Sequence, residues 1–568
     1  MADRYKKIGL VAVNASYSHS SLSLRCLKKA LADKKVTARE FTINDRVQNA
    51  AARLYLDGCG LYAFSCYIWN ISFVLDVCRI LKAAAPECSI LLGGPEVSYD
   101  AAAVLEAYPF IDFVLCGEGE RSLPAFLSGA PYEAVDGLAY RKDGQAVTNP
   151  PQVIENLDIL PRLYTKEELA QLTHKIIYYE TSRGCPFRCS YCLSSTSHGV
   201  RFFSLARVLE DLQLFMDCGV PLVKLVDRTF NIDRARTKQI LRYILSHNKS
   251  TCFHFEVASD ILDEETIALL ANAPKGMFQL EIGVQSTNAD TLAAIDRKTD
   301  FTQLRKTVAA LQQNKNMHIH LDLIAGLPYE DYARFTQSFD DVFALRPDML
   351  QLGFLKLLKG TKIRREADKY GYRFTPQPPY EVLSNRFISY AQLLRLEGVE
   401  DMVERYYNSG AFEKALEYAL GEYNSAYLFF DALASFFRKQ GYADAPQSKK
   451  SLYAILHAFY NQSGKGNKAL FSDLLKFDFV KNNPNLALPD WADKAGDKRF
   501  YQAAYAFLES EQGAKYVPDC AGKKRTELKQ AAKVEKFNFD VCGTYKFGEC
   551  AVVFDLIHKS FTKILEKF

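Results

Sequence analysis

The chain has 568 residues, of which 48% are hydrophobic and 24% are charged, and its formal net charge is +4. This length exceeds what one hydrophobic core usually organises, so we expect two to four domains. The composition excludes extensive disorder, and so small a net charge does not by itself indicate a nucleic-acid or membrane partner.

The sequence gives no indication of an apolar segment that would direct the chain to a membrane. The first residues lack the long apolar run of a signal peptide, and no stretch has the length of a transmembrane span. The fourteen cysteines are therefore expected as reduced thiols or metal ligands rather than as a disulfide framework. We expect a cytoplasmic protein without a membrane partner.

Short apolar runs alternate with helical periodicity in the first third of the chain, which we assign to one domain over residues 1–150. This alternation is typical of an α/β fold with a doubly wound, Rossmann-like parallel sheet. Strands are predicted at 8–13, 61–65, 89–92 and 113–115, and helices at 21–31, 71–84 and 101–107.

Polar or glycine-rich segments follow three of these strands. Parallel sheets bind ligands at this edge, and glycine lets the backbone approach a ligand closely. Each segment alone is explained by a tight turn, but the three together favour a ligand cleft. The candidate residues are Ser65, Tyr67, Trp69, Asn70, Gly93, Gly94, Pro95, Glu96, Gly117, Glu118, Gly119 and Glu120.

Residues 6–127 resemble the cobalamin-binding domain that precedes the catalytic barrel in one large group of radical S-adenosylmethionine (SAM) enzymes. The resemblance implies that the cleft residues contact cobalamin. In methionine-synthase-type domains an Asp-x-His-x-x-Gly loop supplies the lower cobalt ligand. Here His19 follows the first strand without that aspartate or glycine. The resemblance therefore implies a corrin that is bound without a protein histidine.

Three cysteines lie within eight residues of the central region. Cys185, Cys189 and Cys192 follow a strand predicted at 175–179. Spacings of four and three let one loop hold three corners of a four-iron cluster, which leaves one iron without a protein ligand. A structural zinc ion normally has four ligands, so zinc would need a further Cys or His from elsewhere.

This spacing, with Tyr191 just before the third cysteine, resembles the signature of the radical SAM superfamily. The resemblance implies that the open iron of a [4Fe-4S] cluster chelates SAM, and that reductive cleavage yields a 5′-deoxyadenosyl radical. It also implies an electron donor such as flavodoxin or ferredoxin.

The pattern of strands and helices continues to about residue 378. Strands are predicted at 222–226, 253–258, 277–284, 318–324 and 351–358, with helices at 207–216, 234–245 and 301–313. They predict a partial (β/α) barrel of the radical SAM type over residues 151–378, with its chemistry at the carboxyl ends of the strands.

The resemblance places further cofactor contacts at these strand ends. Gly326, Leu327 and Pro328 resemble the family's adenine-contacting turn. Asp227 could equally cap a helix, and Glu256 could be an interior charge held by an arginine. The full set beyond the cysteines is Tyr191, Asp227, Glu256, Gln285, Arg297, Gly326, Leu327 and Pro328.

Residues 379–568 are predicted to form an α-rich accessory domain with a small β element. Helices are expected at 382–397, 410–420, 425–440, 451–461 and near 557–566, and strands at 537–541 and 549–554. This region resembles the uncharacterised domain that several relatives carry after the barrel.

A group of basic residues in this region could meet the phosphates of a nucleic acid such as tRNA, or an acidic carrier. A solvated helical face is the commoner explanation. The group consists of Lys523, Lys524, Arg525, Lys529, Lys533 and Lys536.

Three hypotheses of function follow from these patterns. The leading one is a cobalamin-dependent radical SAM methyltransferase that acts on an unactivated carbon. A second keeps both cofactors but forms a ring, contracts a ring or oxidises its substrate without methyl transfer. A third is a cobalamin and iron–sulfur protein that senses redox state without turnover. The sequence does not identify the substrate.

Overall fold

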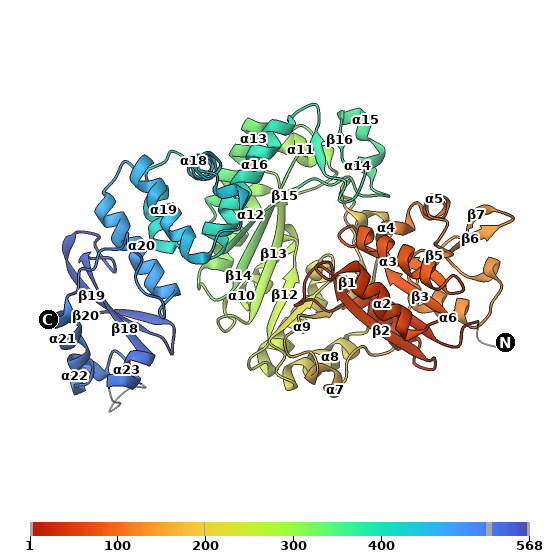
Figure 1. Ribbon diagram of the computed structural model, residues 1–568, viewed down its shortest axis with the longest axis horizontal. Coiled ribbons are helices and arrows are strands. Elements are labelled where there is room, and N and C mark those ends of the chain that lie inside the picture. The colour runs from red at the N-terminus through yellow and green to blue at the C-terminus, as the bar shows by residue number, and fades with distance from the viewer. Residues whose placement is uncertain (1–3, 198, 519–524, 565–568) are drawn as a thin grey trace. The chain divides into compact units, whose positions relative to one another are not determined.

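The computed structural model describes residues 4–197, 199–518 and 525–564. The chain forms two compact units (Figure 1). The first takes in the chain up to Asp348 together with Leu352–Leu393, and the second takes in Met349–Gln351 and the chain from Leu394 onward. The domain boundaries near residues 150 and 378 fall inside the first unit and stay predictions.

The first unit begins with a seven-stranded sheet of order β2-β1-β3-β4-β5-β6-β7. Strands β1 to β5 are parallel, and β6 and β7 extend the sheet as an antiparallel pair. The doubly wound N-terminal domain is thus confirmed. Its elements are β1 (Ile8–Asn14), α1 (Leu22–Ala30), β2 (Val36–Thr42), α2 (Val47–Asp57), β3 (Leu61–Ser65), α3 (Ile71–Ala84), β4 (Ser89–Gly93), α4 (Pro95–Ser98), α5 (Ala101–Ala107), β5 (Phe113–Leu115), α6 (Gly119–Leu127), β6 (Leu138–Lys142) and β7 (Gln145–Thr148).

The side chains of β1 pack alternately into two hydrophobic cores, one on each face of the sheet. Ile8, Leu10 and Ala12 pack with residues of α1 and α6, whereas Val11 and Val13 pack with residues of α2, α3 and α5. Successive side chains of a strand point to opposite faces, so a continuous apolar run needs helices on both sides.

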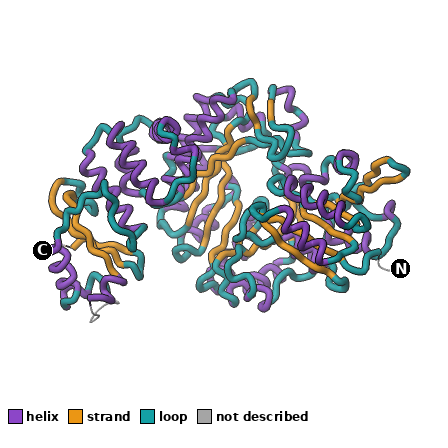
Figure 2. Tube along the Cα trace, viewed as in Figure 1, coloured by secondary structure: helices purple, strands orange, loops and turns teal. Residues whose placement is uncertain are grey.

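The second sheet of this unit has the order β15-β14-β13-β12-β11-β8, and its neighbours from β8 to β14 are parallel. Helices separate these strands along the chain (Figure 2). The partial (β/α) barrel is therefore confirmed. Its main elements are β8 (Ile177–Tyr179), α8 (Leu205–Asp217), β11 (Leu222–Leu225), α9 (Arg234–His247), β12 (Cys252–Glu256), α10 (Glu264–Ala271), β13 (Phe278–Gln285), α11 (Ala289–Ala294), α12 (Phe301–Gln312), β14 (His318–Ala325), α13 (Tyr332–Phe343) and β15 (Met349–Phe354).

The helix predicted over residues 382–397 is wrong in its first half. Residues Val382–Ser384 form the short strand β17, which pairs with β16 (Arg373–Phe374), and helix α16 spans Tyr390–Met402. The side chain of Asn385 accepts hydrogen bonds from the backbone N–H groups of Phe387 and Ile388. This turn uses the backbone groups that a continuing helix would need.

The second unit is rich in helices and ends in an antiparallel sheet of order β18-β19-β20. The α-rich domain with a small β element is confirmed. Its main elements are α17 (Glu413–Leu420), α18 (Ala426–Lys439), α19 (Lys449–Ser463), α20 (Lys468–Asn482), α21 (Lys498–Leu508), α23 (Arg525–Ala531), β18 (Ala532–Phe539), β19 (Phe547–Asp555) and β20 (Ser560–Ile564).

The helix predicted near residues 557–566 is wrong, because Ser560–Ile564 is strand β20, paired with β19. Asp555 accepts hydrogen bonds from the backbone of Ile557 and His558, and Lys559 has a φ of 51°. These features form a turn that reverses the chain before a helix could begin. In the described part of the chain, no helix combines the length and apolar character that crossing a membrane requires.

The basic residues near 525–536 do not form one helical face. Arg525 and Lys529 lie on α23, whereas Lys533 and Lys536 lie on β18. Arg525 pairs with Glu509, Lys536 pairs with Glu549, and Lys533 donates to the carbonyl of Pro484. Lys523 and Lys524 lie outside the described residues. The described members are therefore largely engaged within their own unit.

Candidate active site

A cavity of about 2050 Å³ lies at the carboxyl ends of the barrel strands. Its wall includes the three cysteines of the central motif and residues in or after β11, β12, β13 and β14. Tyr99 and Asp100, which follow α4 in the N-terminal domain, line the same cavity. Pockets for one small molecule usually measure about 300–1,000 Å³, so this cavity has room for more than one ligand.

A two-stranded sheet fixes the loop that carries the thiols. Strand β9 (Ser182–Gly184) pairs antiparallel with β10 (Val200–Phe202), so the chain leaves and returns at one place. Gly184 has a φ of +101°, and a Cβ there would lie 2.2 Å from the carbonyl oxygen of Gly199. Only glycine fits this approach. All three thiols line the cavity.

The loop is also fastened to the barrel. The backbone N–H of Ser190 donates to the carbonyl of Ile295 at 2.9 Å, and the carbonyl of Ser190 accepts from Ile363 at 2.9 Å. The Sγ of Cys185 lies 3.7 Å from the Oγ1 of Thr229, which follows β11. These contacts hold the thiols against the strand ends.

Arg297 places a positive charge beside one of the thiols. Its Nη1 lies 3.8 Å from the Sγ of Cys189 and 3.5 Å from the Oη of Tyr191, and its Nη2 donates to the carbonyl of Gly283. Burial raises the pKa of the Cys189 thiol, and the Arg297 guanidinium opposes that rise. A cation here would stabilise the thiolates that a cluster needs.

Three thiols from one loop are the donor set that a four-iron cluster takes, with each thiol bound to a different iron. Among the described residues, no three His, Cys, Asp or Glu side chains are grouped as a single-ion site.

Neighbouring barrel strands carry polar groups that contact one another. Glu281 on β13 accepts from the Nε2 of His254 at 3.0 Å and from the Nζ of Lys224 at 3.2 Å. The hydrogen bond from His254 outweighs burial and lowers the pKa of Glu281 to about 2. Burial raises the pKa of Glu256 above its usual range, and the charge of Glu281 adds to that rise.

Two buried oxygens in the cavity wall lack a partner among the described residues. They are the Oδ1 of Asp322 on β14 and the Oε1 of Gln285 at the end of β13. Burial, aided by the charges of Glu281 and Glu256, raises the pKa of Asp322 to about 8. Buried polar atoms are rarely left unpaired, so these oxygens are suited to donors of a bound ligand such as SAM.

Asp322 was missed by the sequence reasoning, although a signal was present. Strand β14 reads His-Ile-His-Leu-Asp-Leu-Ile-Ala, with Ile319, Leu321 and Leu323 fully buried. Polar residues at every second position of a buried strand indicate a polar barrel interior. That alternation could have identified Asp322.

Of the predicted barrel residues, the cavity wall includes Tyr191, Glu256, Gln285 and Arg297 in addition to the thiols. Asp227 lies elsewhere. Its carboxylate is buried, and it accepts from the N–H and hydroxyl groups of Thr181 at 3.0 and 2.7 Å and from the hydroxyl of Ser182. It therefore ties the residues after β8 to the end of β11.

The turn Gly326-Leu327-Pro328 follows β14 outside the residues that line the cavity. Gly326 has a φ of +90°, and its carbonyl accepts from the Oη of Tyr372 at 3.0 Å and the Nδ2 of Asn385 at 2.9 Å. These hydrogen bonds shape the turn, and a contact with adenine stays a prediction.

The residues predicted at the cobalamin edge follow the adjacent strands β3, β4 and β5. The amide of Asn70 donates to the carbonyls of Val13 and Ser65 at 2.9 and 3.0 Å, so it braces the strand ends. Tyr67 and Trp69 stack with ring centroids 4.4 Å apart, and Trp69 is half exposed. A Cβ on Gly94 would lie 2.5 Å from the carbonyl oxygen of Cys66, so the glycine is required there.

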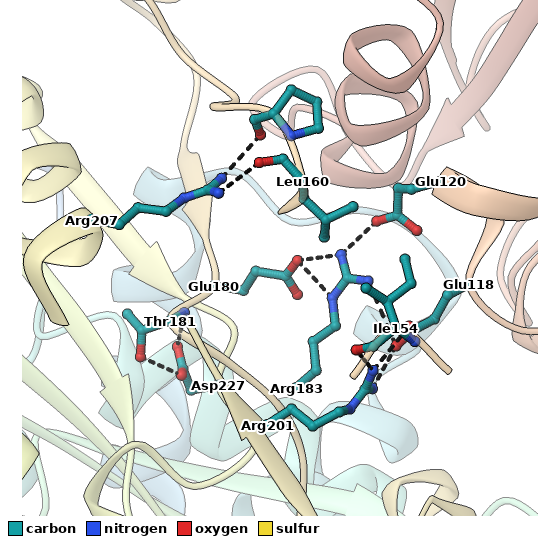
Figure 3. Close-up of polar contacts among 11 residues, drawn as sticks. Glu118, Glu120, Ile154, Leu160, Glu180, Thr181, Arg183, Arg201, Arg207 and Asp227 are labelled. Carbon is teal, nitrogen blue, oxygen red and sulfur yellow. Dashed lines mark hydrogen bonds and ion pairs between the residues drawn. The ribbon is translucent and has the colours of Figure 1, made fainter. Parts of the chain in front are cut away.

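The carboxylates of that edge are occupied by partners from the barrel side. Glu96 accepts from the hydroxyl of Tyr380 and lies 3.4 Å from the Nζ of Lys359. Glu118 and Glu120 pair with Arg201 and Arg183 (Figure 3). His19 contacts the hydroxyl of Tyr178 on β8 through its Nδ1.

The fold and the cavity are those expected for a radical SAM barrel that follows a cobalamin-binding type of N-terminal domain. Three family models match the chain in this order. The B12 binding domain matches residues 8–127, the Radical SAM superfamily matches 179–342, and a protein family of unknown function, DUF4080, matches 368–554. The cofactors are accordingly a [4Fe-4S] cluster, SAM and cobalamin.

Curated relatives are similar to part of this chain. The cobalamin-dependent radical SAM methyltransferase TokK of Streptomyces tokunonensis is 27% identical over 350 residues, which cover 56% of this chain and 50% of that protein. The anaerobic magnesium-protoporphyrin IX monomethyl ester cyclase of Synechocystis is 27% identical over 260 residues, covering 42% and 50%. The chain thus spans about half the length of these curated relatives.

The structure of the cobalamin-dependent SAM radical enzyme OxsB, with aqua-cobalamin and SAM bound, superposes with a TM-score of 0.59. The match covers 92% of this chain and 84% of that one at 14% identity, so it shows a shared fold.

Proposed function

We propose that the protein is a cobalamin-dependent radical SAM methyltransferase that acts on an unactivated carbon. One observation carries the proposal: the three thiols and Tyr99 of the N-terminal domain line a single cavity. A methyl donor and a radical initiator must both reach one substrate atom, and a shared cavity permits this. The similarity to TokK supports the same reading.

Residues of the cavity wall would hold the cluster and SAM. When bound, the cluster with SAM supplies a 5′-deoxyadenosyl radical and cobalamin supplies a methyl group. Cys185, Cys189 and Cys192 would hold the cluster, and Arg297 would offset their negative charge. Asp322 and Gln285 would accept hydrogen bonds from SAM.

Tyr99 is well placed to shape the cobalamin side of the cavity. Its Oη lies 2.7 Å from the Oγ1 of Thr196, beside the thiol loop. A Cβ on Gly360 would lie 2.2 Å from the Tyr99 ring, so the absence of a side chain at residue 360 makes room for it. We propose that the edge formed by Ser65, Trp69 and the Gly94 and Gly117 turns contacts the corrin.

The experiment is anaerobic reconstitution of the full chain with iron, sulfide and hydroxocobalamin, followed by incubation with reductant and SAM. We expect both 5′-deoxyadenosine and S-adenosylhomocysteine. The triple variant C185A/C189A/C192A should lose cluster absorbance and 5′-deoxyadenosine while it retains cobalamin. Failure to form either product with any reductant would contradict an enzymatic role and favour redox sensing.

A second candidate is ring formation, ring contraction or oxidation without methyl transfer. The similarity to the magnesium-protoporphyrin cyclase favours it. Production of 5′-deoxyadenosine without S-adenosylhomocysteine would support this candidate against methyl transfer.

Either reaction needs an external one-electron donor, for which we propose a flavodoxin or ferredoxin. We also propose a cytoplasmic location, where thiols stay reduced.

A further inference from the structure

Two arginines stand at the entry to and exit from the thiol loop. Arg183 on β9 and Arg201 on β10 are direct partners in the antiparallel pair. Like charges directly opposite each other destabilise such a pair, so this register needs compensation. Three glutamates provide it: Glu118, Glu120 and Glu180.

The guanidinium of Arg183 contacts all three of these glutamates (Figure 3). Its Nη2 lies 2.5 Å from the Oε1 of Glu120 and 2.6 Å from the Oε1 of Glu180, and its Nε donates to Glu180 at 3.0 Å. Its Nη1 lies 3.6 Å from Glu118. The guanidinium is planar and presents its donors in fixed directions, so these contacts set its orientation as well as its charge balance.

Glu118 joins the two arginines to a third segment. It accepts from the Nη2 and Nη1 of Arg201 at 2.5 and 3.0 Å and from the backbone N–H of Ile154 at 2.8 Å. Arg201 also donates to the carbonyl of Ile154 at 2.5 Å. The five charged side chains therefore form one connected network rather than separate pairs.

The network is shielded from water. The exposed fractions of its side chains are 9% for Glu120, 13% for Arg183 and Glu180, 16% for Arg201 and 18% for Glu118. Charges in such an environment interact strongly, and removal of one leaves the others uncompensated. Because three carboxylates face two guanidiniums, neither arginine can be lost without a large imbalance.

The two ends of the network belong to different cofactor domains. Glu118 is the N-cap of α6 and Glu120 lies in the first turn of that helix, at the edge where we propose that cobalamin binds. Arg183 precedes Cys185 by two residues, and the intervening Gly184 lies in the same paired strand, opposite Val200 on β10. A shift of the β5–α6 turn would therefore reach the first thiol through a short connection.

We propose that Arg183 is a positioning residue that couples cobalamin binding to cluster binding through Glu118 and Glu120. Coupling between two sites is reciprocal, so the cluster must change cobalamin affinity by the same factor as cobalamin changes the cluster's. The inference rests on the proposed function only in that both cofactors bind. It does not depend on methyl transfer or on a substrate.

The test measures the dissociation constant of hydroxocobalamin in the full chain, once with the cluster reconstituted and once with iron removed. In the unmodified protein we expect the cluster to tighten cobalamin binding by about five- to tenfold. The variants R183K and E120Q should bring this ratio close to one while both cofactors still bind. R183K keeps the charge but cannot reproduce the orientation, so it separates positioning from charge compensation.

Glu133 offers a matched control on the same domain. It pairs with Lys142, and both side chains are more than half exposed, so E133Q should leave the ratio unchanged. If R183K does not assemble a cluster, the ratio of dissociation constants measured for E120Q tests the proposal. The proposal is overturned if the unmodified protein shows no ratio above one, if E120Q retains the full ratio, or if both variants lose both cofactors together with thermal stability.

Discussion

Two sets of acidic side chains lie at strand ends of the first unit, and the fold uses them differently. Glu96, Glu118 and Glu120 of the N-terminal domain are all paired with cations or hydroxyls from the barrel side. In the barrel, by contrast, Asp322 keeps an oxygen without a partner, and burial raises the pKa of Glu256 as well.

The difference separates two roles that a sequence motif cannot distinguish. A carboxylate whose charge is already compensated contributes to the arrangement of domains. One that lines a cavity and lacks a partner is destabilising until a ligand satisfies it. We therefore expect removal of a paired carboxylate to reduce stability, and removal of an unpaired one to reduce ligand affinity.

The largest effect should follow Glu118→Ala, which tests the paired set. It leaves Arg201 and part of Arg183 without compensation in a shielded position, and we expect a loss of about 3 kcal/mol in the free energy of unfolding. Urea denaturation of the full chain, followed by circular dichroism, measures this. The double variant E118A/R201A should recover part of the loss. A cost below about 0.5 kcal/mol, within the range of an exposed pair, would contradict a structural role for Glu118.

How far the sequence could anticipate this arrangement depends on the range of the interactions. Strands β3 and β5 and the helices α3 and α5 were predicted with their observed bounds, because apolar periodicity is a local signal. Strand β2 was not predicted, since Val36–Thr42 lies at the sheet edge and is only half buried. The cysteine loop was evident because its three thiols are close in sequence.

The partners of the acidic residues could not be anticipated. Glu118 and Arg201 are 83 residues apart, and no spacing rule links them. The same limit applies to Asp227, whose hydrogen-bond donors Thr181 and Ser182 lie on another strand end. The glycine-rich strand ends predict a ligand edge, which stays a prediction, and they do not indicate which of its side chains contact another domain.

An intermediate effect should follow Asp322→Asn, which tests the unpaired set. The folded-state pKa of about 8 lies far above the usual value for aspartate, so the folded protein holds a proton that the unfolded chain has released. The contribution of Asp322 to the free energy of unfolding of the unliganded protein therefore falls as pH rises from about 4 to 8. Asparagine should remove that slope without destabilising the fold.

The same substitution should change the binding of SAM. If Asp322 accepts a hydrogen bond, SAM affinity of the reconstituted protein rises with pH up to about 8 and then levels off, because binding must displace the proton. In D322N the affinity should be about tenfold lower at pH 8.5 and independent of pH. Isothermal titration across this range measures both. Affinity that falls with pH would show instead that the carboxyl group donates.

The smallest effect concerns Asp478 in the second unit, a buried carboxylate whose partners are backbone N–H groups. It accepts from Ala415 at 2.9 Å and Lys414 at 3.3 Å, in the first turn of α17. Burial raises its pKa to about 7 against the effect of these two hydrogen bonds. Since the folded-state pKa again exceeds the unfolded value, ionisation destabilises this unit between pH 4 and 7.

Asp478→Asn keeps one acceptor for the α17 backbone and removes the titration. We expect the decline in the midpoint of thermal unfolding between pH 4 and 7 to become smaller, with the remainder coming from groups such as Asp322. The free energy of unfolding at pH 8 should change by no more than about 1 kcal/mol. Asp217, which is exposed on α8 and accepts a hydrogen bond from Gln213, provides a control in D217N. If D478N keeps the full decline of the unfolding midpoint, Asp478 is ionised in the folded protein over the whole range from pH 4 to 7. Backbone hydrogen bonds alone would then compensate a buried carboxylate as fully as arginine compensates Glu118.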